Sequence, residues 1–216
     1  MKRLIIYDLD GTLVDTREDI ARAANHMLSF FNVPSLDRPV IERFVGKGLH
    51  HLIKSCLKTE DTKQIEKGSK VYREYYAKHM LDHTVLYPGA QGALNFFKDR
   101  LQAVITNKPN PYSRQILEAL GIAGYFVEIV AGDTDYPKKP DPTAVLSIMK
   151  REKVETDETL FVGDSLIDIE TGRNAGIETV VISHGFEGEE TLQSANSAGV
   201  VGSFDELLTF ARQKGW

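Results

Sequence analysis

The sequence is poor in cysteine and has no long apolar stretch. Cys56 is the only cysteine among 216 residues, so no disulfide can form within the chain, and no CxxC pair or Cys/His cluster is present. This usage is typical of a protein of a reducing compartment. The first apolar run, Leu4–Tyr7, is far too short for a signal peptide or a membrane span. We therefore expect a cytoplasmic location and no association with membranes.

The chain also lacks an excess of positive charge. It carries 26 Lys and Arg residues against 31 Asp and Glu residues, which gives a formal net charge of −5. A broad basic surface is what draws proteins to nucleic acids and to anionic lipids. We therefore expect no nucleic-acid partner, and an anionic ligand must be held by a few local positive groups.

Short apolar runs, each typical of a buried strand of a parallel sheet, recur along the sequence. They are Leu4–Tyr7, Leu101–Ile105, Val127–Ala131, Thr159–Val162 and Thr179–Ile182. The segments between the later runs begin with proline or capping residues, and two of them end at glycine, as helices do. Strand and helix in alternation predict a doubly wound, Rossmann-like α/β fold with a parallel sheet covered on both faces.

One long segment interrupts this alternation. Apolar residues recur at helical spacing throughout residues 16–83, which predicts an all-α insert. An aromatic stripe near its end, which we interpret as a face packed into a core, contains Tyr72, Tyr75, Tyr76 and His79. The sequence thus predicts a discontinuous α/β core formed by residues 1–15 and 84–216, and an inserted helical cap formed by residues 16–83.

Polar residues follow the predicted strands, where the ligands of open α/β sheets bind. They are Asp8 and Asp10 after the first strand, Thr106 and Asn107 after the second, Lys138 and Lys139 after the third, and Asp164 and Asp168 after the fourth. Carboxylates brought this close repel one another unless protons or a hard cation neutralise them. A few oxygen ligands, with space left for water and a substrate phosphate, favour magnesium. We therefore expect Mg²⁺ as the cofactor.

Four segments resemble the four motifs of the haloacid dehalogenase-like hydrolase superfamily, in the expected order. They are DLDGTLVD at 8–15, the Thr106-Asn107 pair, the Lys139-Pro140-Asp141-Pro142 element and GDSLIDIETGRNAG at 163–176. The helical insert resembles the small α-helical cap of that superfamily, and the whole most resembles the phosphoglycolate phosphatases. The resemblance implies a phosphatase that hydrolyses a small phosphorylated metabolite, with 2-phosphoglycolate as the best candidate, through a covalent aspartyl-phosphate.

The resemblance also implies catalytic roles. Asp8 is the expected nucleophile, and Asp10 is expected to protonate the leaving group and then to take a proton from the attacking water. Asp8, the backbone carbonyl of Asp10 and Asp164 are the expected metal ligands. Lys139, preferred to its neighbour Lys138, is expected to screen the charge of the phosphate.

Further residues are expected to bind the phosphate or to support the site. Thr106 and backbone N–H groups near Leu9 and at Asn107 would bind the non-bridging phosphate oxygens. Supporting roles fall to Gly11, Thr12, Asp15, Ser165 and Asp168. In the cap, Lys47 lies between two glycines and is a candidate to contact a substrate carboxylate, although a solvated lysine in a tight turn explains it equally well. For Arg17 and His184 we favour a surface or supporting position.

Other activities remain open. Asp10 argues against dehalogenation, because that reaction has no leaving group that needs a proton. Sugar phosphomutases, pyrophosphatases and nucleotidases of the same superfamily share the motifs, and only the cap separates them from the phosphatases. A phospho-acceptor signalling module is a remote alternative, since such a domain has no helical insert after its first strand. We expect a monomer or a homodimer.

Overall fold

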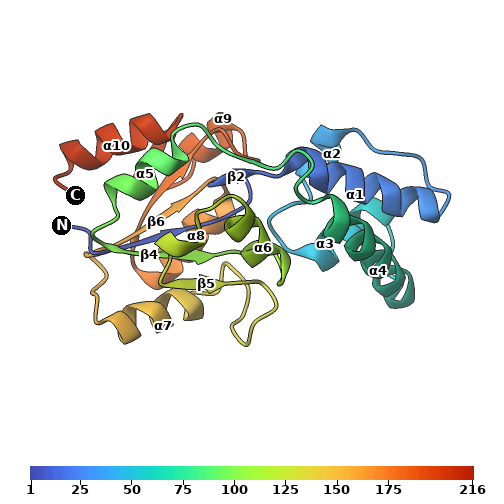
Figure 1. The fold of residues 1–216 in the computed structure, drawn as a ribbon, viewed down its shortest axis with the longest axis horizontal. Helices are drawn as coiled ribbons and strands as arrows, with labels where there is room; N and C mark the ends of the chain where they lie inside the picture. Colours follow the sequence, from blue (N-terminus) through green and yellow to red (C-terminus); the bar gives the residue numbers. More distant parts are fainter.

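The computed structural model describes residues 1–216 and shows an α/β part beside a smaller helical part (Figure 1). The chain enters the helical part after the first strand and returns to the α/β part before the second strand of the sheet. No helix is long and apolar enough to cross a membrane.

Six parallel strands form the central sheet, in the order β5-β4-β1-β6-β7-β8. They are β1 (Leu4–Tyr7), β4 (Leu101–Ile105), β5 (Glu128–Val130), β6 (Thr159–Gly163), β7 (Glu178–Ile182) and β8 (Gly199–Val201). All four residues of β1 are fully buried, because β1 lies between β4 and β6 and both of its faces are covered. A strand buried on both faces needs a continuous apolar run, which is the pattern in the sequence.

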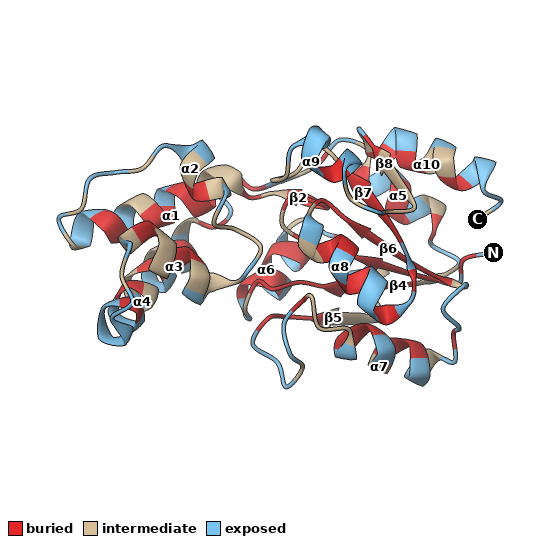
Figure 2. Cartoon of the chain, turned by 180° about the vertical axis from the view of Figure 1, so that it is seen from behind, coloured by how far each residue is buried: buried red, intermediate tan, exposed pale blue.

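Helices cover both faces of the sheet. They are α5 (Ala90–Phe96), α6 (Tyr112–Ala119), α7 (Thr143–Glu152), α8 (Leu166–Ala175), α9 (Glu189–Gln193) and α10 (Phe204–Gln213), with a 3₁₀ turn, η1, at Ala123–Tyr125. Alternate residues of β1 belong to different apolar clusters: Ile5 and Tyr7 pack with α5, α6 and α10, whereas Leu4 and Ile6 pack with α7 and the end of α8. Figure 2 shows the buried strands between helices whose outer faces are exposed. The predicted doubly wound α/β fold is confirmed.

The helical part contains four helices, which all fall within residues 16–83. They are α1 (Arg17–Phe30), α2 (Arg38–Glu42), α3 (Leu49–Leu57) and α4 (Thr62–His79). Helices α1 and α3 pack against α4, and buried Met27, Ile53 and Ile65 belong to the apolar cluster that continues into the core. The exact division into core and cap stays a prediction.

The chain enters and leaves the helical part through a two-stranded antiparallel ribbon. Its strands are β2 (Val14–Asp15) and β3 (Val85–Leu86), paired Val14 with Leu86 and Asp15 with Val85. Neither this ribbon nor β8 was predicted, because strands of two or three residues are too short to show a periodic pattern. The third predicted strand, 127–131, is shorter by one residue at each end.

Candidate active site

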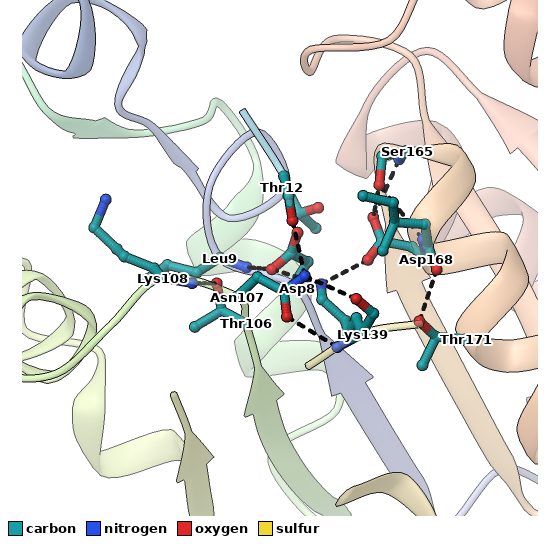
Figure 3. Close-up of polar contacts among 12 residues, drawn as sticks. Asp8, Leu9, Thr12, Thr106, Asn107, Lys108, Lys139, Ser165, Asp168 and Thr171 are labelled. Carbon is teal, nitrogen blue, oxygen red and sulfur yellow. Dashed lines mark hydrogen bonds and ion pairs between the residues drawn. The ribbon is translucent and has the colours of Figure 1, made fainter. Parts of the chain in front are cut away.

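Three carboxylates gather at the carboxyl ends of two neighbouring strands. Asp8 directly follows β1, Asp164 directly follows β6, and Asp168 lies in the first turn of α8. One oxygen of each lies within 4.8 Å of the other two, and all three residues are buried. Asp8 and Asp168 converge from different elements in Figure 3. The structure thus brings Asp8 and Asp164 close enough to share one ion.

Burial and mutual repulsion perturb these acids. Burial, with the neighbouring acids Asp168 and Asp10, raises the pKa of Asp8 to about 7 from an ordinary 3.8, against the opposing effect of Lys139. Burial, followed by the charges of Asp168 and Asp8, raises the pKa of Asp164 well above its ordinary value. Buried carboxylates that are costly to ionise together are favourable ligands for a divalent cation. These residues therefore fit a metal ion.

A buried lysine neutralises part of this charge. The Lys139 Nζ forms an ion pair with Asp8 Oδ1 at 2.9 Å and donates a hydrogen bond to Asp168 Oδ1 at 2.7 Å. Burial acts to lower the pKa of Lys139, but Asp168 and Asp8 together raise it above its ordinary value, so the ammonium stays charged. Its neighbour Lys138 is exposed. The structure places Lys139, and not Lys138, beside the expected nucleophile.

Asp168 is held by the start of helix α8. Ser165 is the N-cap of this helix in a capping box, and Asp168 Oδ2 accepts from the Ser165 hydroxyl at 2.7 Å and from the backbone N–H groups of Ser165 and Asp164, both at 3.1 Å. Because Oδ1 accepts from Lys139, both oxygens of Asp168 already have partners. Asp168 is therefore arranged to orient Lys139. Its Oδ2 already accepts three hydrogen bonds, whereas each oxygen of Asp164 accepts only one, so Asp8 and Asp164 keep more capacity for a metal ion.

Asp164 is held by the turn after β1 and by the loop after β7. The Thr12 hydroxyl donates to Asp164 Oδ1 at 2.8 Å, and the Phe186 N–H donates to Oδ2 at 2.9 Å. Gly11 has a φ of +83°, and a Cβ atom there would lie 2.3 Å from Asp164 Oδ2. The turn needs glycine at this position both for its conformation and for the close approach of the carboxylate.

Asp10 belongs to a different set of contacts. Its Oδ1 accepts from the Thr16 hydroxyl at 2.7 Å and from Lys108 Nζ at 2.9 Å, and its carboxylate is not part of the cluster around Asp164. No role was predicted for Lys108. Its position directly after the Thr106-Asn107 pair was the only signal that could have indicated one.

Two of the groups expected to bind phosphate, the Thr106 hydroxyl and the Leu9 N–H, lie close to Asp8 or to the cavity. Thr106 is buried, and its hydroxyl accepts from the Lys108 N–H at 3.2 Å. The Leu9 N–H donates to the Asp8 side chain, at 2.7 Å from Oδ1, so this donor is occupied by the carboxylate in the structure. Each of these groups is next to Asp8 or to the cavity above it.

The Asn107 side chain ties three segments together. Its Nδ2 donates to the Gly46 carbonyl in the helical part at 2.8 Å and to the Lys139 carbonyl at 3.0 Å, and its Oδ1 accepts from the Lys139 N–H at 2.9 Å. The side chain thus fixes the loop that carries Lys139 and fastens a cap loop above the site. Because the side chain is occupied, only the backbone N–H of Asn107 remains to contact a phosphate.

Four further candidates lie around this centre. Asp15 binds Arg17 through both carboxylate oxygens, with Nε at 2.8 Å and Nη2 at 2.5 Å. His184 Nε2 lies 3.1 Å from the Thr12 carbonyl oxygen, which is a supporting position. Lys47 is exposed and is not among the residues that line the cavity.

A cavity of about 60 Å³ lies between the helical part and the acids Asp8 and Asp10. Its core side includes Asp8, Asp10 and Thr106, and its helical side includes Leu49, Tyr72 and Tyr76. The aromatic stripe of α4 therefore divides. Tyr72 and Tyr76 are buried against the cavity, whereas Tyr75 and His79 are half-buried and stack on each other with ring centroids 4.3 Å apart. Our interpretation of the whole stripe as one packed core face was wrong, because only two of its four members are buried.

The fold and these residues define an α/β enzyme whose acidic site is covered by inserted helices. The chain belongs to the haloacid dehalogenase-like hydrolases: the model of that family matches residues 5–182. The predicted family and the predicted hydrolase class are confirmed. Phosphatases of this family generally depend on a metal ion, and the acidic cluster is suited to hold one.

Relatives of the chain share most of its length. It is 34% identical over 217 residues to a phosphoglycolate phosphatase of Vibrio parahaemolyticus serotype O3:K6, covering 95% of this chain and 94% of that protein. A phosphoglycolate phosphatase of Pseudomonas syringae pv. tomato is 33% identical, with 96% and 79% covered. The crystal structure of a predicted phosphoglycolate phosphatase from Haemophilus somnus 129PT superposes with a TM-score of 0.92 at 25% identity, covering 97% and 98% of the two chains.

Proposed function

We propose that this protein is a Mg²⁺-dependent phosphatase that hydrolyses a small phosphate monoester through an aspartyl-phosphate on Asp8, with 2-phosphoglycolate as the best candidate substrate. The observation that carries the proposal is the surroundings of Asp8, which is buried beside Lys139 and Asp164 and borders the cavity. The names of the relatives support the substrate. A cytoplasmic location and a monomeric or homodimeric state stay predictions.

The first half of the reaction requires that an anionic nucleophile approach an anionic ester. Asp8 would attack the phosphorus in line with the leaving oxygen, which forms the bond from phosphorus to Asp8 and breaks the ester bond. Lys139, which is paired with both Asp8 and Asp168, would offset part of the negative charge of the nucleophile and of the ester. A bound Mg²⁺ ion, held by Asp8, Asp164 and the Asp10 carbonyl, would supply further charge neutralisation. Thr106 and the Asn107 N–H group would hold the non-bridging oxygens, and the Leu9 N–H would join them by exchanging its bond to Asp8 Oδ1 for one to the phosphate.

The second carboxylate would move protons. Asp10 lies two residues from Asp8 but has its own partners, Thr16 and Lys108. In its acid form it would protonate the leaving alkoxide, and as a base it would then take a proton from the water that attacks the aspartyl-phosphate. Its separation from the Asp164 cluster leaves it free for this role.

The cap would select the leaving group and exclude water from the site. The cavity between Asp8 and Tyr76 has a volume of about 60 Å³, which is room for about two waters at roughly 30 Å³ each. A space of this size favours a leaving group as short as glycolate. A nucleoside or a hexose would need a wider opening between cap and core, so the cavity supports a short leaving group.

The test is phosphate release by the purified chain with Mg²⁺ or with EDTA. We expect the highest kcat/KM with 2-phosphoglycolate when it is compared with pyrophosphate, a nucleoside monophosphate and a sugar phosphate. Asp8→Asn should lower kcat by roughly a thousandfold or more, whereas Asp99→Asn, at an exposed acid, should not change it. Rapid quenching should trap phosphate on the wild-type chain only. Appreciable turnover by Asp8→Asn would exclude the covalent mechanism.

A further inference from the structure

Lys108 is the only cationic side chain among the fifteen residues that line the cavity. Its side chain is 6% exposed, and its Nζ lies 2.9 Å from Asp10 Oδ1 and 4.7 Å from the centroid of the Tyr76 ring. An ammonium has three N–H donors, and Asp10 is its one hydrogen-bonded partner in the protein. The remaining donors are therefore available to a ligand in the cavity.

A second donor borders the same cavity. Tyr76 is 1% exposed, and its hydroxyl has no hydrogen-bond partner in the protein. Buried hydroxyl groups almost always have a partner, so a bound ligand is a natural acceptor for this one. The neighbouring cap residues Leu49, Leu52 and Val45 are apolar and offer no competing charge.

We propose that Lys108, together with the Tyr76 hydroxyl, binds a carboxylate on the leaving group and thereby makes the enzyme prefer phosphate monoesters of short hydroxy acids. The proposal rests on the proposed function, in which Asp10 protonates the leaving oxygen. Because Lys108 Nζ is bonded to Asp10, a carboxylate attached through one carbon to that oxygen lies within reach of the same ammonium. The cap side of the cavity is apolar, and apolar surroundings strengthen such a charge-assisted contact.

The direction of the Lys108 side chain agrees with a contact to the leaving group. Figure 3 shows Lys108 extending away from Asp8 and Asp168, and so away from the phosphate side of the site. In an in-line displacement the leaving group departs on the side opposite the nucleophile. Lys139 is not an alternative receptor, because it is already bonded to two carboxylates. Lys47, the candidate from the sequence, is exposed and lies outside the cavity lining.

The experiment compares two esters that differ in the carboxylate. We would measure kcat/KM for 2-phosphoglycolate and for ethyl phosphate, and use their ratio as the readout, because both esters need the same proton from Asp10. Lys108→Met is expected to lower the ratio by about 10- to 100-fold, the effect of losing a charge-assisted hydrogen bond. Lys108→Arg should keep part of the preference. Lys47→Met, at the exposed cap lysine, should leave the ratio unchanged.

A binding measurement and a second variant protect the test against failed folding. In an Asp8→Asn background, which cannot turn over the ester, calorimetry would give the affinity for 2-phosphoglycolate and for ethyl phosphate with and without Lys108→Met. Tyr76→Phe removes only a hydroxyl that has no protein partner, so it should fold normally and lower the ratio by about threefold or more.

The outcomes separate this proposal from the proposed function. If Lys108→Met lowers kcat/KM equally for both esters, Lys108 acts only through Asp10. If it changes neither kcat/KM nor the ratio, Lys108 plays no part. Either result overturns the proposal. A ratio that falls with Lys47→Met and not with Lys108→Met would place the receptor in the cap loop. If the wild-type chain hydrolyses neither ester, the proposed function has failed, while the calorimetric comparison still decides whether Lys108 binds the carboxylate.

Discussion

Without a metal ion, the protein is expected to lose stability as the pH rises from about 4 to about 7. The cause is the buried acid cluster, in which the pKa of Asp8 is raised to about 7 from 3.8 and that of Asp164 is raised as well. Between these two pH values the folded chain keeps a proton on Asp8 that the unfolded chain has released. The free energy of unfolding must then fall as the pH rises.

The size of the effect follows from the shift at Asp8. A tenfold change in proton affinity corresponds to about 1.4 kcal/mol, so a pKa raised from 3.8 to about 7 corresponds to a loss of about 4 kcal/mol across this window. Asp164 adds a loss of the same sign. His184 has the opposite effect, because burial lowers its pKa from 6.5 and the folded state gains stability as that group becomes neutral. The difference between wild type and Asp8→Asn isolates the contribution of Asp8.

The assay is urea unfolding followed by circular dichroism between about pH 4 and about pH 8, in EDTA and in saturating Mg²⁺. A bound divalent ion keeps the carboxylates ionised, so the decline should disappear in Mg²⁺, and the stability gained from the metal should grow with pH. Asp8→Asn should show a shallower decline in EDTA than the wild type. A metal-free stability that is flat or rises over this range, or a Mg²⁺ effect that is equal at both ends of it, would refute the reasoning.

Three further changes test how the site is held. Asp168→Asn weakens the partner of Lys139, so we expect kcat to fall by about tenfold or more with little change in fold, measured by steady-state kinetics and circular dichroism. Gly11→Ala should cost roughly 1 to 3 kcal/mol in urea unfolding and weaken metal binding, because its φ is +83° and a Cβ would clash. Gly92→Ala, in a helix with open space around it, should be neutral or stabilising in the same assay. Asn107→Ala should free both the cap loop at Gly46 and the loop that carries Lys139. We expect a higher KM, a lower kcat and faster proteolysis of the cap.

The sheet was predictable because its central strands are buried on both faces. A run such as Leu4–Tyr7 or Thr159–Gly163 has to be apolar throughout, and that leaves a clear signal in the sequence. The ribbon of Val14–Asp15 with Val85–Leu86 leaves none, since each strand has two residues and the pairing joins distant segments. Local patterns record burial, but they do not record which short segments meet.

The acids of the site were predictable for a related reason. Asp8 and Asp164 each follow a buried strand directly, and parallel strands place such residues at one edge. The partners of Asp10 were not predictable, because Lys108 and Thr16 come from loops whose course depends on the packing of the cap. The inward direction of Tyr76 likewise follows from how α4 packs against the core, and helical spacing alone cannot choose between the cavity and the outer surface.

The pairing of each acid with its own lysine explains how two carboxylates two residues apart can do different work. Asp8 is bound to Lys139 among the acids of β6 and α8, whereas Asp10 is bound to Lys108 beneath the cap. The first pair is surrounded by negative charge and suits a metal ion and a phosphate. The second pair borders a cavity whose cap side is apolar and suits a leaving group. Because the two lysines have no acid in common, loss of Lys139 should impair every ester alike, whereas loss of Lys108 should impair chiefly those that carry a carboxylate.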